Sequence, residues 1–403
     1  MVVTDLPAAY YTEVDWKDFD HTGPGTLAGR FMRTFWQPIF RSEDLAAGRA
    51  FPIKIMNQGF TLYRGKSGSA YLVDFRCAHR LTQLSTGWVE GENIRCHFHG
   101  WMYDGSGQCV DQPVEPEPFC DQVRINGYPV EEYLGYIFAF LGEGSAPPLP
   151  RYPQFENPNA VIEALPPEYC SSNYFRRVET AADEAHLLFT HRFNFTQYQD
   201  LAIPHVEGHE TDYGVLTTAA RPTGPLRMTH LVMPNIMYVT NGARFSEELA
   251  TRDRIVWKVP IDDTSYWDIG ILAVHISDEK ARAAYLGRSK QIEAAKAPAR
   301  ARTPEFVEAI LAGKMRVEEV EDRTDITHIE DDLVLNGQGA LEDRDHEVLG
   351  RADVAIVMIR QVWERELRNL AERRPLKQWS GWEDLFVEDA GVGRPRVSVF
   401  EQA

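Results

Sequence analysis

The chain has 403 residues, in which 60 aspartates and glutamates outnumber 42 lysines and arginines and give a formal net charge of -18. This acidity excludes a nucleic-acid binder, which needs a dense basic surface, and electrostatic attachment to anionic lipid. At roughly 150 residues per domain the length predicts two to three domains, and hydrophobic residues at 43% are typical of a folded globular protein.

Nothing in the sequence indicates export or a membrane. The first 20 residues carry acids and no apolar stretch of a secretory signal, and no apolar run approaches the roughly 20 residues that cross a bilayer. The five cysteines are an odd number in a chain without an export signal, so they do not indicate a disulfide framework. We therefore expect a cytoplasmic protein whose reduced cysteines are available as metal ligands.

The first third of the chain is rich in β-forming residues and turn glycines. Residues 58–63 and 69–75 are expected to form strands on either side of the turn 64–68. The apolar run 133–141 is expected to form one buried strand. The proline-rich segment 146–150 can continue neither a helix nor a sheet, which makes it the best domain boundary in the chain.

The remainder mixes helices with strands. Residues 178–191 are expected to form a helix, strands are expected from about 210 to 275, and the alanine-rich segment 278–312 is expected to be helical. A last helix is predicted over 352–372, because its apolar residues recur at a spacing that suits one buried face. This order predicts a small β domain set within a larger α+β domain.

Two cysteines and two histidines occur at metal-ligand spacing. Cys77 and His79 are two apart, Cys96 and His99 are three apart, and sixteen residues separate the pairs. A Cys2His2 zinc site would use the same residue types, but zinc fingers usually group Cys with Cys and His with His. Here each pair supplies one Cys and one His, which suits a [2Fe–2S] cluster with two thiolates on one iron and two imidazoles on the other.

Together with Arg80 and the following Gly100-Trp101, these pairs closely resemble the motif of a Rieske [2Fe–2S] domain. The resemblance covers about residues 36–145, and it selects His99 rather than His97, which we expect on the loop surface. Two neutral imidazoles would give the cluster a higher reduction potential than four thiolates. The implied cluster ligands are Cys77, His79, Cys96 and His99.

A second group of ligand-type residues comprises Asp183, His186 and His191. Asp183 and His186 are three apart and would share the face of a helix. His186 and His191 are five apart and would lie about 140° out of phase on a straight helix. Both imidazoles reach one metal only if the helix ends or bulges between them. Taken alone, such a pair is more often structural than metal-binding.

In this order along the chain, the two groups resemble the motifs of Rieske non-heme iron oxygenases, in particular the phthalate-dioxygenase-like group. The resemblance implies His186 and His191 as ligands of a mononuclear Fe(II), completed by one carboxylate. It also implies an all-β Rieske domain over 36–145 and a catalytic domain formed by 1–35 and 146–403. The catalytic domain would be α+β, with an antiparallel sheet flanked by helices.

The carboxylate ligand is assigned by the same resemblance. In the phthalate-dioxygenase-like group it precedes a G-x-I-x-D-R pattern, and matching Gly339 and Asp343-Arg344 to that pattern places the ligand on Asp331. Asp332 is the runner-up, one residue away. Two weaker alternatives, Asp343 and Asp353, are expected as caps or surface charges. Asn336 and Ala340 depart from the pattern of the group, which leaves the substrate open.

The resemblance gives Asp183 a separate role as a bridge. Its carboxylate would hydrogen-bond His186 and a Rieske histidine, His99, across a subunit interface in a trimer or in stacked trimers. An electron would pass by this route from the cluster to the mononuclear iron, and Asp183 would also orient its histidine. The alternative for Asp183 is a salt bridge with Arg176 or Arg177.

The implied activity is that of a terminal oxygenase (alpha) subunit, which hydroxylates or dihydroxylates an aromatic substrate with O2. Oxidative O- or N-demethylation is the alternative. No G-x-G-x-x-G fingerprint opens a helix, so NAD(P)H and flavin are expected on a separate reductase, with or without a ferredoxin. The acidic charge is a candidate for steering a basic face of that reductase. A Rieske electron carrier and a zinc-stabilised binding protein are the alternatives from other classes.

The substrate pocket is expected to draw on residues 195–245, although a core role is open for each apolar residue there. A carboxylated substrate would need a pocket arginine. His205 and His209 are expected in a polar loop rather than at the substrate. The pocket candidates are Phe195, Tyr198, Met228, Met233, Met237 and Tyr238, with Arg221, Arg227 and Arg244 as the arginines.

Overall fold

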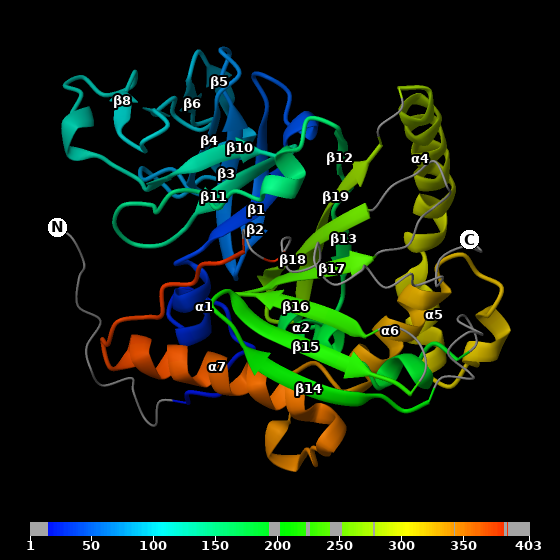
Figure 1. Ribbon diagram of the computed structural model, residues 1–403. Helices are drawn as coiled ribbons and strands as arrows, with labels where there is room; N and C mark the ends of the chain where they lie inside the picture. Colours follow the sequence, from blue (N-terminus) through cyan, green and yellow to red (C-terminus); the bar gives the residue numbers. More distant parts are fainter. Residues whose placement is uncertain are drawn as a thin grey trace.

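The computed structural model describes a β lobe of small sheets beside a larger lobe built on one sheet with helices around it (Figure 1). No helix in the described part of the chain combines the length and the apolar character that crossing a membrane requires. The described residues are 15–192, 202–222, 226–241, 252–276, 279–341, 343–382 and 385.

The β lobe consists of three antiparallel sheets, with strand orders β1-β11-β10, β2-β3-β4-β9 and β5-β6-β7-β8. The expected hairpin is confirmed, because β3 and β4 pair antiparallel through Arg64 and Ala70. The strands are β1 (Trp36–Arg41), β2 (Ala50–Ile55), β3 (Gln58–Arg64), β4 (Ala70–Asp74), β5 (Trp88–Glu90), β6 (Asn93–Arg95), β7 (Met102–Tyr103), β8 (Cys109–Asp111), β9 (Gly127–Tyr128), β10 (Val130–Tyr133) and β11 (Tyr136–Phe140).

The run 133–141 is not one strand, as the sequence led us to expect, but a hairpin. β10 ends at Tyr133 and pairs back on β11 from Tyr136. The turn between them places Leu134 at φ 50 and Gly135 at φ 82, a left-handed conformation that glycine adopts without strain. Apolar content alone did not reveal this turn, because both strands and the turn leucine are apolar.

The larger lobe is built on an eight-stranded antiparallel sheet in the order β12-β19-β18-β17-β16-β15-β14, with β13 also pairing with β19. The strands expected from about 210 to 275 are therefore confirmed. They are β12 (Ala160–Ala164), β13 (Glu168–Cys170), β14 (His205–Glu210), β15 (Gly214–Ala220), β16 (Arg227–Val232), β17 (Ile236–Asn241), β18 (Arg252–Asp262) and β19 (Ser265–His275).

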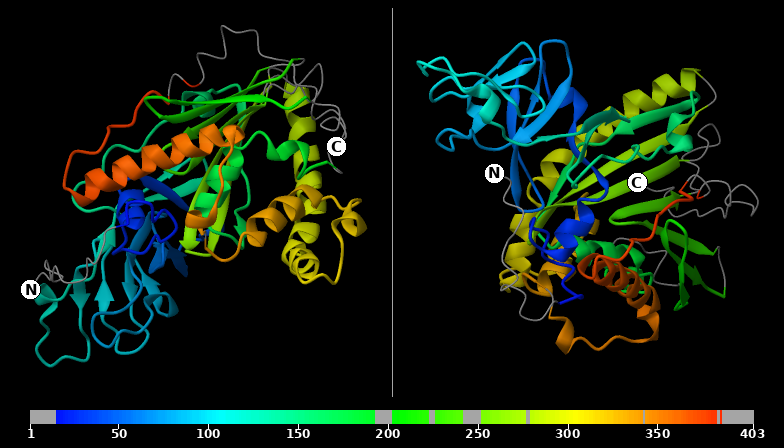
Figure 2. Two further views of the ribbon diagram at one scale, coloured as in Figure 1. Left: turned by 90° about the horizontal axis from the view of Figure 1, so that it is seen from below. Right: turned by 90° about the vertical axis from the view of Figure 1, so that its left-hand side faces the viewer.

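Helices flank this sheet, and α7 runs along it beside β14 and β15 (Figure 2). The last helix is confirmed at α7, but the segment 278–312 divides into α4 and α5, and the helix expected over 178–191 ends nine residues early, at Ala182. The helices are α1 (Leu27–Met32), α2 (Tyr174–Ala182), α4 (Glu279–Arg300), α5 (Thr303–Leu311), α6 (Ile326–Gly337) and α7 (Val354–Ala371).

One apolar core extends across both lobes. It includes Phe60 and Phe138 of the β lobe together with Trp257 of β18, whose ring centroid lies 5.6 Å from that of Phe138. The backbone continues this contact, since Met56 donates its amide N–H to the Pro260 carbonyl at 2.8 Å. A separate small core lies around the cysteine and histidine loops at the far end of the β lobe. The lobes are therefore packed as one body.

Candidate metal centres

The first candidate centre lies on two loops at the end of the β lobe. Cys77 and His79 follow β4, and Cys96 and His99 lie between β6 and β7. Both cysteines are buried, and the hydrogen bond between their thiols lowers the pKa of the Cys77 thiol. The two imidazole rings lie 4.6 Å apart between centroids. The structure thus brings the four predicted residues together, with the sulfurs adjacent and the rings adjacent.

Backbone turns and aromatic side chains hold these loops in place. Gly100 has φ 78, which lets its amide N–H turn back to the Cys96 carbonyl at 3.1 Å. Trp101 stacks on the His79 ring at 4.6 Å with an interplanar angle of 9°. The Tyr103 hydroxyl lies 3.2 Å from Cys77 Sγ, a contact that the motif did not reveal.

The donor atoms fit an iron–sulfur cluster. His99 Nδ1 is buried, and no hydrogen bond satisfies it within the described residues. A buried imidazole nitrogen without a partner is costly unless it binds a metal. Two thiols and two imidazoles on two loops are the donor set of a [2Fe–2S] cluster with mixed ligands. His97 is exposed and packs on Trp88 at 4.8 Å, as the spacing predicted for a surface residue.

The second candidate centre begins where α2 ends. Asp183 has an extended backbone with φ -82 and ψ 104, so Asp183 and His186 do not share a helix face. Its Oδ1 accepts the amide N–H of Ala185 at 2.8 Å and of His186 at 3.2 Å. This local turn competes with the helix and starts a 3-10 turn over His186–Leu188. The break that lets both histidines face one point therefore occurs before His186.

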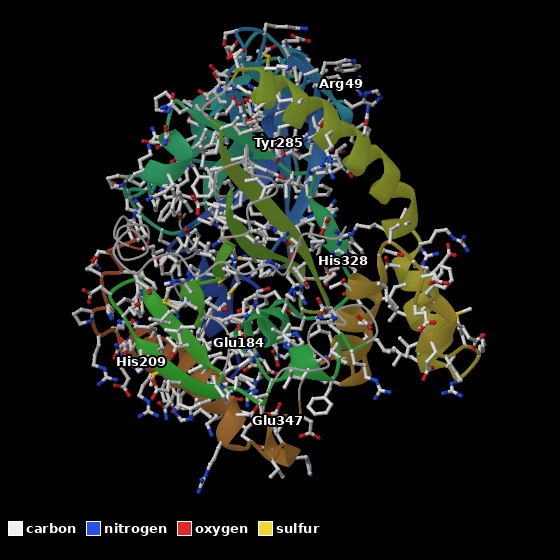
Figure 3. The ribbon with its side chains drawn as sticks, turned by 45° about the vertical axis from the view of Figure 1, so that its right-hand side comes forward. Arg49, Glu184, His209, Tyr285, His328 and Glu347 are labelled. Carbon is white, nitrogen blue, oxygen red and sulfur yellow. The ribbon has the colours of Figure 1, made fainter. Side chains whose placement is uncertain are left out.

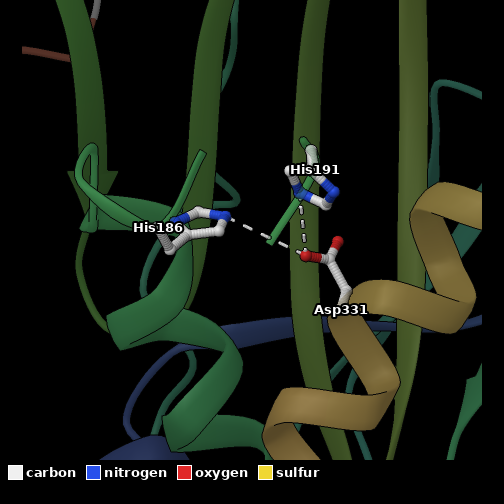
Figure 4. Close-up of side chains that lie close together, drawn as sticks. All are labelled: His186, His191 and Asp331. Carbon is white, nitrogen blue, oxygen red and sulfur yellow. Dashed lines mark ion pairs between the residues drawn. The ribbon is translucent and has the colours of Figure 1, made fainter. Parts of the chain in front are cut away.

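Three side chains meet at this second centre, and Figure 4 shows His186, His191 and Asp331 facing one another. One ligand atom from each lies within 4.8 Å of the others. Asp331 Oδ1 is 3.2 Å from His191 Nε2 and 3.9 Å from His186 Nε2. Asp331 comes from α6, so the group joins two segments that are far apart in the sequence. The runner-up, Asp332, is not part of this group.

Hydrogen bonds select which imidazole nitrogens face the centre. His191 Nδ1 lies 2.9 Å from Oε2 of the buried Glu330, and His186 Nδ1 contacts the Asp183 carbonyl. Each contact occupies Nδ1 and leaves Nε2 for a metal. Sequence reasoning missed Glu330, although its position directly before Asp331 is the one signal that pointed to it.

Asp331 has the character of a metal-ligating carboxylate. Its Oδ1 is buried, and no hydrogen bond of acceptable geometry satisfies this oxygen within the described residues. Burial raises the pKa of Asp331, but Arg177 together with His191 and His186 outweighs burial and holds that pKa well below its usual range. An ionised carboxylate with one free oxygen and two imidazoles is the donor set of a 2-His-1-carboxylate site.

The contact between Asp183 and His186 differs from the expected one. The Asp183 backbone carbonyl contacts the ring, whereas the carboxylate Oδ2 is 3.9 Å from His186 Nδ1. The carboxylate stays 24% exposed. Arg176 donates to the Leu335 carbonyl at 3.1 Å, and Arg177 pairs with Asp331 at 2.7 Å. The Asp183 carboxylate is therefore accessible from outside the chain.

The two described arginine candidates contact a buried acid next to Asp183. Arg227 Nε donates to Glu184 Oε2 at 2.8 Å, and Arg221 Nη2 is 3.9 Å from the same oxygen. Glu184 is 2% exposed, and sequence reasoning did not single it out. These two arginines therefore neutralise the protein's own carboxylate, and Arg244 lies outside the described residues.

The remaining pocket candidates divide between core, surface and undescribed residues. His205 and His209 lie on the strand β14, not in a loop, and both are exposed at the sheet edge, where Figure 3 shows His209. Phe195 and Tyr198 lie outside the described residues, and Met228 is half-buried on β16. Core positions are occupied by Met233, Met237 and Tyr238.

Comparison with known proteins relates the chain to oxygenase subunits. The family of the Rieske [2Fe-2S] domain matches residues 35–133. The 5,5'-dehydrodivanillate O-demethylase oxygenase subunit of Sphingobium sp. (strain NBRC 103272 / SYK-6) is 27% identical over 372 residues, covering 87% of this chain and 78% of that protein. The 3-chlorobenzoate-3,4-dioxygenase oxygenase subunit of Comamonas testosteroni is 35% identical over 182 residues, covering 44% and 42%.

Solved structures share the fold. The reduced complex between oxygenase and ferredoxin in carbazole 1,9a-dioxygenase matches with a TM-score of 0.62 at 20% identity, covering 84% of this chain and 90% of that chain. Pseudomonas putida CBB5 NdmA with caffeine matches with a TM-score of 0.64 at 20% identity, covering 85% and 93%. The chain thus contains a Rieske [2Fe–2S] domain, and the relatives that it matches are named as oxygenase subunits.

Proposed function

We propose that Cys77, His79, Cys96 and His99 hold the cluster of this oxygenase, and that His186, His191 and Asp331 hold its mononuclear Fe(II). The observation that carries the second assignment is the convergence of two Nε2 atoms and one carboxylate oxygen within 4.8 Å. When bound, the cluster supplies electrons singly and the mononuclear iron activates O2.

The protein's own groups prepare the mononuclear site before any metal enters. Glu330 and the Asp183 carbonyl occupy the Nδ1 atoms, which fixes both imidazole rings and directs Nε2 inward. Asp183 holds the turn that carries His186 and leaves its carboxylate at the surface. We propose that this carboxylate meets a histidine of a neighbouring subunit's cluster, His99 of a second copy, in a trimeric assembly.

We propose an aromatic substrate that is hydroxylated or dihydroxylated. A second candidate reaction is oxidative O-demethylation of a methoxylated aromatic compound. It is favoured because the relative named as an O-demethylase subunit aligns with 87% of the chain, which includes the mononuclear centre. The relative named as a chlorobenzoate dioxygenase subunit aligns with 44%. The two reactions yield different products from the substrate.

Metal analysis and oxygen uptake together test this function. We expect a red-brown protein with about three irons per chain, two in the cluster and one mononuclear. Oxygen uptake is then measured with a generic reductase and two kinds of substrate. A demethylase should consume oxygen and release formaldehyde from methoxylated aromatics. A dioxygenase should consume oxygen and convert aromatic acids into diols. A colourless protein with stoichiometric zinc contradicts the assignment, and two irons without oxygen uptake indicate an electron carrier.

We propose that the electron donor docks beside the Cys77 loop. A groove of about 780 Å³ opens there, and Ala78 of that loop is part of its lining. Arg76 and Arg124 line it together with Asp74 and with Lys54, which pairs with Asp262 at 2.9 Å. The groove is cationic although the whole chain is strongly acidic, so it favours a donor with an acidic contact surface. The acidic net charge of the chain had suggested a donor with a basic contact face. A basic face does not complement the charge of this groove.

Charge reversal at Arg124 tests the docking site. Arg124 donates to the Ser106 carbonyl and is exposed. We expect Arg124→Glu to slow cluster reduction by an acidic ferredoxin by about tenfold at low salt, with a smaller effect at high salt. Stopped-flow absorbance of the cluster measures the rate. Arg302→Glu, at a 60% exposed arginine beside α5 in the other lobe, is the matched control. Equal rates for both variants would place the donor elsewhere.

A further inference from the structure

The two oxygens of the Asp331 carboxylate have different surroundings. Oδ1 faces the imidazoles of His191 and His186, at 3.2 and 3.9 Å from their Nε2 atoms. Oδ2 forms a salt bridge of 2.7 Å with Arg177 Nη1. Asp331 is 9% exposed and Arg177 is 21% exposed, so water competes little for either group. One oxygen is thus turned toward the metal position while the other is already engaged.

This arrangement bears on how the carboxylate can bind a metal. A carboxylate ligates through one oxygen or through both. With two imidazoles, a single oxygen leaves three positions of an octahedron open, whereas two oxygens leave two. We propose that Arg177 is a positioning residue that restricts Asp331 to ligation through Oδ1 and so keeps one more coordination position open. This inference rests on the proposed mononuclear iron site.

The Arg177–Asp331 bond is strong enough to hold this geometry. A hydrogen bond between two ionised groups is roughly twice as strong as one between neutral groups, and its energy rises where water is scarce. The guanidinium of an arginine stays charged at any ordinary pH. For Oδ2 to bind the metal as well, this bond would have to break inside the protein.

Arg177 is also placed so that it links the two segments that carry the ligands. It lies on α2, which leads directly into the turn of His186, whereas Asp331 lies on α6. One nearby cation, Lys258, is itself paired with the buried Asp268. Arg177 is the arginine that forms the salt bridge with Asp331. A role limited to joining the helices would affect stability but not the coordination of the metal.

The test counts the water molecules bound to iron. The full-length protein is loaded with Fe(II) and nitric oxide, and the EPR spectrum of the adduct is recorded in ordinary and in ¹⁷O-enriched water. With Asp331 bound through one oxygen, nitric oxide leaves two positions for water. We expect broadening from two waters in the wild type and from one water in Arg177→Leu, because the freed Oδ2 takes the other position. Arg177→Lys, which retains a cation, should restore much of the broadening.

A matched control lies next in the chain. Arg176 is also buried on α2 and also contacts the α6 region, through the Leu335 carbonyl, but it does not contact Asp331 in any described interaction. Arg176→Leu should lower the melting temperature and leave the water count unchanged. If Arg177→Leu does not fold, Arg177→Gln takes its place, with the same loss of one water expected.

The outcomes separate this inference from the proposed function. If the Arg177 variants bind the third iron normally and keep the water count of the wild type, the proposed role of Arg177 is wrong. The proposed iron site is unaffected by that result. Loss of the same water in Arg176→Leu also overturns it, because the effect would then follow from helix packing. A wild-type protein that forms no mononuclear nitric oxide adduct overturns the iron site, and the inference falls with it.

Discussion

Replacing Asp331 with asparagine is expected to remove the mononuclear iron and to leave the [2Fe–2S] cluster in place. The variant loses the negative charge that faces two imidazole nitrogens, while the cluster ligands lie in the other lobe around their own small core. Iron should fall from about three to about two per chain, with the red-brown colour retained. Oxygen uptake coupled to substrate should disappear. Asparagine is chosen over alanine because it can still accept from Arg177, which limits the cost of leaving a buried charge unpaired.

The adjacent carboxylate provides the control. Asp332 is one residue further along α6 and was the alternative ligand by sequence, but it is not part of the group around His186 and His191. Burial raises the pKa of Asp332 to about 6, so neutralising it costs little. Asp332→Asn should keep its full iron content and its oxygen uptake. The assignment is wrong if the two variants exchange these results.

The second large effect is expected for Asp183→Asn, which should keep both metals and lose turnover. The asparagine side-chain oxygen can still accept the amide N–H groups of Ala185 and His186, which Asp183 Oδ1 accepts at 2.8 and 3.2 Å. The turn that places His186 is thus retained, and only the exposed negative charge is lost. Single-turnover experiments should show a cluster that stays reduced after oxygen is added with substrate, because electrons no longer reach the mononuclear iron.

Asp183→Ala separates the charge of this side chain from its role in the turn. Alanine removes the acceptor as well, so His186 should lose its position and the mononuclear iron should be bound more weakly. The comparison uses the iron content and the turnover rate of Asp183→Asn and Asp183→Ala. Wild-type turnover in Asp183→Asn would exclude the bridge, whatever happens in the alanine variant.

Local sequence patterns predicted the regular elements better than the points where they end. The hairpin of β3 and β4 and the helix α7 lie close to their expected ranges. The helix α2 ends early because the side chain of Asp183 binds the backbone ahead of it, which competes with the next helical hydrogen bonds. A hydrophobic pattern contains no information on such a side-chain contact. The turn at Gly135 was missed because the residues on both sides of it are apolar as well.

The metal-ligating residue types and their spacing could be read from the chain, but their surroundings could not. Glu330 and Arg177 are ordinary charged residues on two helices, and each matters only because α2 and α6 meet in the folded protein. The same limit applies to Glu184, whose arginine partners are on or near strands of the sheet. These partners are defined by tertiary contacts between segments distant in sequence, which periodicity and spacing do not encode.

The apolar core that passes from Phe60 through Phe138 to Trp257 has a consequence for motion. Domains that swing relative to each other are joined by small and rather polar interfaces, whereas here a shared core and backbone hydrogen bonds join the lobes. The separation between the two candidate metal centres of one chain is therefore set by the fold itself. In the proposed assembly, regulation that changes the distance over which an electron travels acts between chains, by altering how neighbouring copies are seated, and not through a hinge inside one of them.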